Sequence, residues 1–241
     1  MRSIARIALL VMLLALSGAY VFALDQQDPK KEASHGNTAL LIEPAFTINP
    51  ARTAVLIMDY ENDIVGMLPV DIRGPLMEKA SMILKEARQA KIQIIYVVVR
   101  FREGYPEVSP QNKLFSVLKQ SGRFVEGTPG AEIDSRVAPQ PGDILVTKRR
   151  VGAFSTTDLE TILRAKNINR LVLLGISTSG VVLSTVRWAA DMDYSLAVVS
   201  DGCADLDPEV NRVLMDKVFP RQATVITSSE FLQAVSTKDL K

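Results

Sequence analysis

Residues 170–192 read RLVLLGISTSGVVLSTVRWAADM. After its first residue, the run Arg170–Ile176 contains no charged side chain, which is typical of a strand buried on both faces of a sheet. The residues from Ser179 to Met192 then predict a helix. A buried strand that leads directly into a helix is the unit from which sheets of parallel strands are built.

The same alternation extends in both directions along the chain. Short apolar runs predict five further strands, and apolar residues spaced three or four positions apart predict further helices. The predicted strands are Ala54–Met58, Ile92–Val99, Asp143–Thr147, Ser195–Ser200 and Ala223–Thr227. The predicted helices are Leu76–Ala90, Thr157–Ala165 with Thr156 or Thr157 as cap, Asp207–Val218 and one at the C-terminus. We therefore predict an α/β fold of three layers, doubly wound and Rossmann-like, with a six-stranded parallel sheet.

Residues 101–142 interrupt this alternation. They contain five prolines and five glycines, which disfavour long helices and central strands. We expect a long excursion from the sheet, of the kind that often shapes a pocket.

The N-terminus has the features of a targeting segment. Arg2 and Arg6 precede the uncharged run Ile7–Leu24, and small residues lie near the end of that run. Residues 1–24 are therefore expected to be a secretory signal peptide or, if uncleaved, a membrane anchor; a wrongly assigned start is the third alternative. Residues 25–45 are polar and predict a tether before a domain at 46–241. The expected location is periplasmic or extracellular, with membrane contact only through an uncleaved segment.

Composition excludes several classes of function. The 28 basic and 27 acidic residues nearly cancel, so we expect no nucleic-acid partner. The single cysteine, Cys203, excludes an intrachain disulfide and a zinc–thiolate cluster. The single histidine, His35, lies in the polar tether, which argues against a His-rich metal site. We expect neither a metal nor a cofactor.

Three features fall at predicted strand ends. Asp59 follows the first strand, Lys148 follows the third, and Gly175–Val181 joins the fourth strand to a helix. Ligands of open parallel sheets bind outside the carboxyl ends of the strands. An aspartate or a lysine at such a place is more often a turn or surface residue. Together, however, they predict an acid/base pair beside a helix N-terminus whose free N–H groups could hold an anion.

Four motifs in this order resemble the isochorismatase-like hydrolases, over about residues 45–230. They are Ala54-Val-Leu-Ile-Met-Asp59-Tyr-Glu-Asn-Asp-Ile64, Val146-Thr-Lys148-Arg-Arg-Val-Gly-Ala-Phe154, Gly175-Ile-Ser-Thr-Ser-Gly-Val181 and Asp201-Gly-Cys-Ala-Asp205. The resemblance implies a six-stranded parallel sheet, a small-molecule substrate and a homo-oligomer. It also places a frequent cis peptide at the bond entering Ser177.

The resemblance implies catalytic roles as well. Amidase members of the family use an aspartate, a lysine and a nucleophilic cysteine; Asp59 and Lys148 match the first two, and Val181 occupies the position of the third. A valine has no lone pair with which to attack a carbonyl. For Cys203, which matches a different position, we expect a buried structural role. A serine or threonine near Val181 acting as nucleophile is a further, weaker alternative.

Three hypotheses for function remain open. Isochorismatases proper also lack the cysteine, and the resemblance to them implies cleavage of an enol ether in which Asp59 donates the proton. Burial would then have to raise the pKa of Asp59 against the lowering effect of Lys148. In the second hypothesis Asp59 activates water to attack an amide or other acyl group. In the third the protein binds a small molecule and catalyses nothing.

Several residues near these positions are candidates for binding the substrate. The side chains or backbone proposed for contact are Tyr60, Phe154, Ser177, Thr178, Ser179 and Gly180, with Trp188 as a further wall. The arginines proposed to bind substrate carboxylates are Arg100, Arg102, Arg149 and Arg150.

Overall fold

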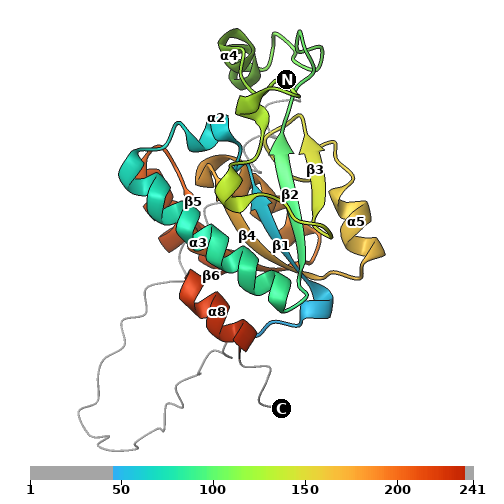
Figure 1. Ribbon diagram of the computed structural model, residues 1–241, viewed down its shortest axis with the longest axis vertical. Helices are drawn as coiled ribbons and strands as arrows, with labels where there is room; N and C mark the ends of the chain where they lie inside the picture. Colours follow the sequence, from blue (N-terminus) through green and yellow to red (C-terminus); the bar gives the residue numbers. More distant parts are fainter. Residues whose placement is uncertain (1–45, 237–241) are drawn as a thin grey trace, which may run out of the picture. The chain divides into compact units, whose positions relative to one another are not determined.

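The computed structural model describes residues 46–236. Six strands form one sheet, all parallel, in the order β3-β2-β1-β4-β5-β6 (Figure 1). They are β1 (Thr53–Met58), β2 (Gln93–Val99), β3 (Ile144–Lys148), β4 (Arg170–Ile176), β5 (Ser195–Ala204) and β6 (Thr224–Ile226). The predicted doubly wound α/β fold is confirmed. The targeting segment and the tether predicted within residues 1–45 lie outside the described residues.

Helices cover both faces of the sheet. The α-helices are α2 (Asn62–Val65), α3 (Val70–Gln89), α4 (Lys113–Ser121), α5 (Leu159–Ala165), α6 (Leu183–Asp191), α7 (Pro208–Val213) and α8 (Ser228–Ser236). Shorter helical turns are η1 (Pro50–Arg52), η2 (Pro129–Ala131), η3 (Ser135–Val137), η4 (Thr178–Val182), η5 (Leu214–Val218) and η6 (Phe219–Arg221). Figure 1 shows α3 and α8 together across one face of the sheet. Within residues 46–236, no helix is both long enough and apolar enough to cross a membrane.

The central strand β1 explains why the strand sequences are apolar without alternation. Successive side chains of a strand point to opposite faces. Val55 and Ile57 pack in the core beneath α3 and α8, whereas Leu56 and Met58 pack in the core beneath α5 and α6. All six residues of β1 are buried. Both faces of the strand therefore require apolar side chains.

Several helices differ from the prediction, among them the short helix α2, which was not predicted. Helix α3 begins at Val70, six residues before the predicted start, and contains Pro75. A proline in the second turn removes only the hydrogen bond to the carbonyl four residues earlier, and the buried side chains that follow hold the helix in place. Helix α4 was not predicted within the excursion, because Phe115 is its one buried side chain. The Asn112 side chain caps it, accepting from Phe115 N at 3.1 Å.

The topology brings three strand ends together. The chain runs from β1 outward through β2 to β3, and then returns to place β4 on the other side of β1. The point where the direction reverses lies between β1 and β4, which is where doubly wound sheets bind ligands. Figure 1 shows α4 beyond the carboxyl ends of β2 and β3.

Candidate active site

Asp59 forms the turn at the end of β1. Its φ of +61° lies in the left-handed region, which aspartate adopts more readily than most residues. Its backbone N–H donates to Val97 O at 2.8 Å, so the turn is tied to β2. Such a conformation costs about 1 kcal/mol or more, and it persists because the surrounding structure fixes it.

Lys148, the last residue of β3, reaches Asp59 from two strands away. The distance from Lys148 Nζ to Asp59 Oδ2 is 2.9 Å, and the two side chains are 2% and 8% exposed. The ammonium also donates to Arg150 O at 3.1 Å. The pair is thus a buried ion pair with one further hydrogen bond, and removing either partner would leave an uncompensated group.

The environment of Asp59 changes its acidity. Burial raises the pKa of the Asp59 carboxyl to about 6, although attraction to Lys148 and its hydrogen bond act in the opposite direction. An acid with a pKa near the working pH exchanges its proton readily in both directions. The carboxyl is therefore suited to general acid or general base catalysis.

A second buried carboxyl, Glu61, lies beside this pair and was missed from the sequence. Glu61 Oε1 accepts from Val99 N at 2.6 Å, and the side chain is fully buried. Burial and the charge of Asp59 raise the pKa of Glu61 well above its ordinary value. Within residues 46–236, neither Glu61 Oε2 nor Asp59 Oδ1 has a hydrogen-bond partner. The signal available in the sequence was its place two residues after Asp59, in the same polar run.

The turn after β4 contains a cis peptide bond between Ile176 and Ser177, as expected at that bond. Gly175 has no room for a side chain, because a Cβ there would lie 2.7 Å from Val182 Cγ2. At the start of η4, Ser179 N donates to Asp205 Oδ2 at 2.7 Å. The helix N-terminus that was expected to offer its N–H groups to an anion thus already binds a carboxylate of the protein.

One cavity of about 270 Å³ joins these elements. Five of the residues singled out in the sequence line it: Asp59, Lys148, Ser177, Gly180 and Val181. The excursion forms another part of the wall, as predicted, through Leu114, Phe115, Leu118 and Phe124. The remaining lining residues are Ile64, Met67, Leu68, Val99, Val151, Ile176 and Leu206.

Five other candidates for substrate contact, Trp188 included, are not among the lining residues. The Tyr60 hydroxyl donates to Gly202 O at 2.8 Å, within the core. Phe154 stacks on Trp188 with ring centroids 6.4 Å apart and belongs to the core beneath α5 and α6. Ser179 is engaged through its backbone as described above, and Thr178 is buried with its hydroxyl 2.6 Å from Asn211 Oδ1.

The four candidate arginines do not line the cavity either. Arg100 donates to Ala131 O and pairs with Glu132 at 3.3 Å. Arg102 Nη1 and Arg149 Nε both pair with Glu107 Oε1, at distances of 2.5 and 3.1 Å. Arg150 donates to backbone carbonyls, and its guanidinium lies 5.9 Å from the Phe115 ring centroid. Each arginine is therefore bound to protein groups, and Arg150 is the one that also contacts a residue of the cavity wall, Phe115.

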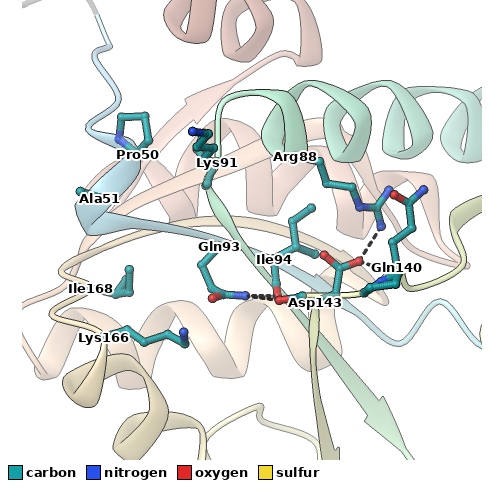
Figure 2. A pocket seen from close by; sticks show the side chains of 13 residues that line it. Pro50, Ala51, Arg88, Lys91, Gln93, Ile94, Gln140, Asp143, Lys166 and Ile168 are labelled. Carbon is teal, nitrogen blue, oxygen red and sulfur yellow. Dashed lines mark hydrogen bonds and ion pairs between the residues drawn. The ribbon is translucent and has the colours of Figure 1, made fainter.

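A larger hollow of about 520 Å³ lies at the opposite edge of the sheet, near the amino ends of β2 and β3 (Figure 2). Its polar groups bind one another: Arg88 pairs with Asp143 at 2.7 Å, and Gln93 donates to Gly142 O at 3.2 Å. Lys91 and Lys166 lie just after α3 and α5, where positive charge complements the helix C-termini. These polar groups stabilise the fold by binding one another or a helix end. We therefore place the candidate active site in the cavity at the carboxyl ends of the strands.

Cys203 offers no nucleophile, and the residues that the structure describes offer no metal site. Cys203 is 5% exposed, and burial raises the pKa of its thiol to about 12. A buried thiol of this kind is unreactive, in agreement with the structural role expected for it. Over residues 46–236, no group of three or more His, Cys, Asp or Glu side chains is placed to hold a metal ion.

Comparison with known proteins shows the family. The isochorismatase domain matches residues 53–230. The chain belongs to the isochorismatase family of hydrolases. It is 32% identical over 190 residues to the uncharacterized isochorismatase family protein YwoC of Bacillus subtilis, a match that covers 79% of this chain and 97% of YwoC.

Two further similarities extend the comparison. The ureidoacrylate amidohydrolase RutB of Rhizobium rhizogenes is 30% identical over 237 residues, which cover 90% of this chain and 92% of RutB. The crystal structure of a cysteine hydrolase from Pseudomonas syringae pv. phaseolicola superposes with a TM-score of 0.73 at 24% identity, covering 80% of this chain and 96% of that one. The latter similarity supports the fold.

Proposed function

We propose that this isochorismatase-family hydrolase cleaves a small enol ether, or a related metabolite, without a covalent intermediate. The observation that carries the proposal is the buried Asp59–Lys148 pair, which lines the same cavity as Val181. The pair supplies a proton donor whose pKa is about 6. Val181 occupies the position where the amidases that this chain resembles have their nucleophilic cysteine, and it supplies no nucleophile.

The reaction follows from these groups. Protonated Asp59 transfers its proton to the vinyl carbon of the substrate, and the double-bond electrons form the new C–H bond. The adjacent carbon becomes an oxocarbenium ion, to which water adds. Water's surplus proton returns to Asp59, and the hemiacetal formed separates into a carbonyl compound and an alcohol. Lys148 stabilises the Asp59 carboxylate between the two proton transfers, at 2.9 Å.

A second candidate function is hydrolysis of an amide or other acyl group by water. It is favoured by the similarity to RutB, which is named an amidohydrolase. In this mechanism Asp59 is the general base and must begin as the carboxylate. A third candidate, a binding protein without catalysis, is disfavoured by the buried ion pair, which costs desolvation energy that an inert pocket does not require.

The pH dependence of kcat/KM separates these functions. If Asp59 acts as the acid, kcat/KM for phenyl vinyl ether should be constant at low pH and fall about tenfold per pH unit above about pH 6. If Asp59 acts as the base, kcat/KM for amides should rise through about pH 6 instead. Absence of turnover across a panel of enol ethers, amides and esters would support the binding protein.

We propose also that the hydrolase is exported, and that it forms a homo-oligomer. Export is supported by Arg2, Arg6 and the uncharged run Ile7–Leu24. Oligomerisation is supported only by the family resemblance. Mass measurement of the secreted or membrane-bound protein tests cleavage of the segment, and light scattering of the purified protein tests oligomerisation.

A further inference from the structure

The cavity that holds the Asp59–Lys148 pair has walls that are otherwise almost entirely apolar. Its volume is about 270 Å³. A cavity of about 150 Å³ accommodates benzene, so this one has room for a ring with a short substituent. Met67, Leu114 and Leu206, which line it, are 41%, 57% and 60% exposed, so the entrance is apolar as well.

Lys148 is the one cationic side chain among the described residues that line the cavity, and above the Asp59 pKa of about 6 the Asp59 carboxylate neutralises its charge. Its ammonium is 2.9 Å from the Asp59 carboxylate and donates to Arg150 O. Arg100, Arg102 and Arg149 pair with protein carboxylates. Arg150 does not line the cavity; it donates to two backbone carbonyls, and its guanidinium lies 5.9 Å from the centroid of the Phe115 ring in the wall. At pH 8 an entering carboxylate would lose its hydration without meeting an unpaired cation among the described lining residues.

The backbone N–H groups of Ser179 and Gly180, at the start of η4, are not free to bind an anion in place of a cationic side chain. Ser179 N donates to the Asp205 carboxylate at 2.7 Å, and Gly180 N donates to Ser177 O at 3.2 Å. The Asp205 side chain is 9% exposed and lies where an anionic ligand of the helix N-terminus would otherwise bind. A second anion there would meet both a filled hydrogen-bond site and a like charge.

We propose that the substrate is an uncharged small molecule with an apolar body about the size of a substituted aromatic ring, and that the cavity rejects carboxylates. This inference rests on the proposed function for the reaction itself, but it concerns only what the cavity admits. The polar part of the substrate meets Asp59 and Lys148, and its apolar part contacts the wall formed by α4 and the segment before α3.

Calorimetric titration of the full chain with benzamide and with benzoate at pH 8 measures this selectivity directly. We expect benzamide to bind at least about tenfold more tightly, since the two ligands have nearly the same shape and differ in charge. Asp59→Asn leaves the Lys148 ammonium without its counter-charge and should raise the affinity for benzoate at least about tenfold. Asp191→Asn, at an exposed position, should change neither affinity.

Met67→Arg, at the exposed entrance, gives a second test if Asp59→Asn does not fold. This variant should bind benzoate more tightly than wild type, whereas Met67→Gln should not.

Wild-type protein that binds benzoate as tightly as benzamide, or binds neither, would overturn the inference. Preference for benzamide without turnover of any enol ether, amide or ester would refute the proposed function alone. Faster turnover of 4-carboxyphenyl vinyl ether than of phenyl vinyl ether would refute the inference alone.

Discussion

Lys148 Nζ lies 2.9 Å from Asp59 Oδ2, although β2 separates the strands that carry the two residues. The lysine stem covers this distance within the protein and leaves the ammonium only 2% exposed. In such a setting the Lys148 charge favours the ionised form of Asp59, whereas burial favours the neutral form and raises its pKa to about 6. The group that exchanges the proton is therefore the Asp59 carboxyl, which Lys148 holds in place.

Asp59→Asn is expected to lower kcat/KM by about 10²- to 10⁴-fold, because an amide can neither give nor take the proton. Asparagine has the same shape and also tolerates a positive φ, so the fold should survive, but at lower stability because the buried Lys148 ammonium loses its counter-charge. Steady-state kinetics and thermal unfolding measure the two effects. Asp191→Asn on the exposed face of α6 is the matched control and should retain full activity. Comparable activity in both variants would remove Asp59 from the mechanism.

The strand ends were the part of the site that the sequence could predict. Continuous apolar runs locate buried parallel strands, and topology brings their carboxyl ends to one edge. Asp59, Lys148 and Val181 were found in this way. Phe154 shows the limit of this reasoning. As a large aromatic residue within the motif it suggested a pocket wall, yet it is buried in the core beneath α5 and α6, with the half-exposed Trp188 stacked on its ring. The direction of a side chain depends on packing that the local sequence does not specify.

Asp205 and Glu61 are two residues of the site whose contacts the local sequence did not predict. The N-terminus of η4 seemed free for an anion, but Asp205 reaches it from the segment after β5. Glu61 reads as one polar residue among several after β1, and only tertiary structure buries it beside Asp59 and bonds it to Val99. Contacts between residues distant in the chain decide whether such groups are solvated or functional.

Glu61→Gln is expected to reduce the loss of stability at high pH. An acid whose pKa is higher in the folded than in the unfolded state contributes stability that is fully present below its unfolded pKa and is lost as the pH rises. Burial and Asp59 raise the pKa of Glu61, so wild type should lose free energy of unfolding between pH 5 and pH 8 in part through this group. Glutamine carries no such proton and preserves the acceptor for Val99 N.

Urea unfolding at both pH values measures this difference in the variant and in wild type. Glu78→Gln, exposed on α3, serves as control and should show the wild-type difference. A Glu61→Gln variant with an unchanged or larger difference between pH 5 and pH 8 would show that Glu61 is not held as the neutral acid.

Cys203→Ala is expected to retain activity within about twofold. The thiol is 5% exposed, its pKa is about 12, and it does not line the cavity. Loss of the sulfur from the core should cost about 1 kcal/mol of unfolding free energy. Activity assays before and after iodoacetamide treatment check the chemistry, and urea unfolding checks the stability. Inactivation of the wild type by the reagent, together with a mass shift on Cys203 during turnover, would instead establish a thiol mechanism.

Val181→Cys, made in the Cys203→Ala background, is expected to create a reactive thiol where the resembling amidases carry theirs. Val181 is 1% exposed and lines the cavity with Asp59 and Lys148, so a sulfur at this position would lie beside a base and a cation. Such neighbours favour the thiolate. Because cysteine is slightly smaller than valine, the cost in stability should be about 1 kcal/mol.

Incubation with small amides and esters, followed by mass spectrometry, should reveal an acyl group on residue 181. Val182→Cys in the same background is the matched control, since residue 182 is equally buried but does not line the cavity. Labelling of both variants to the same extent, or of neither, would mean that position 181 does not correspond to the amidase nucleophile.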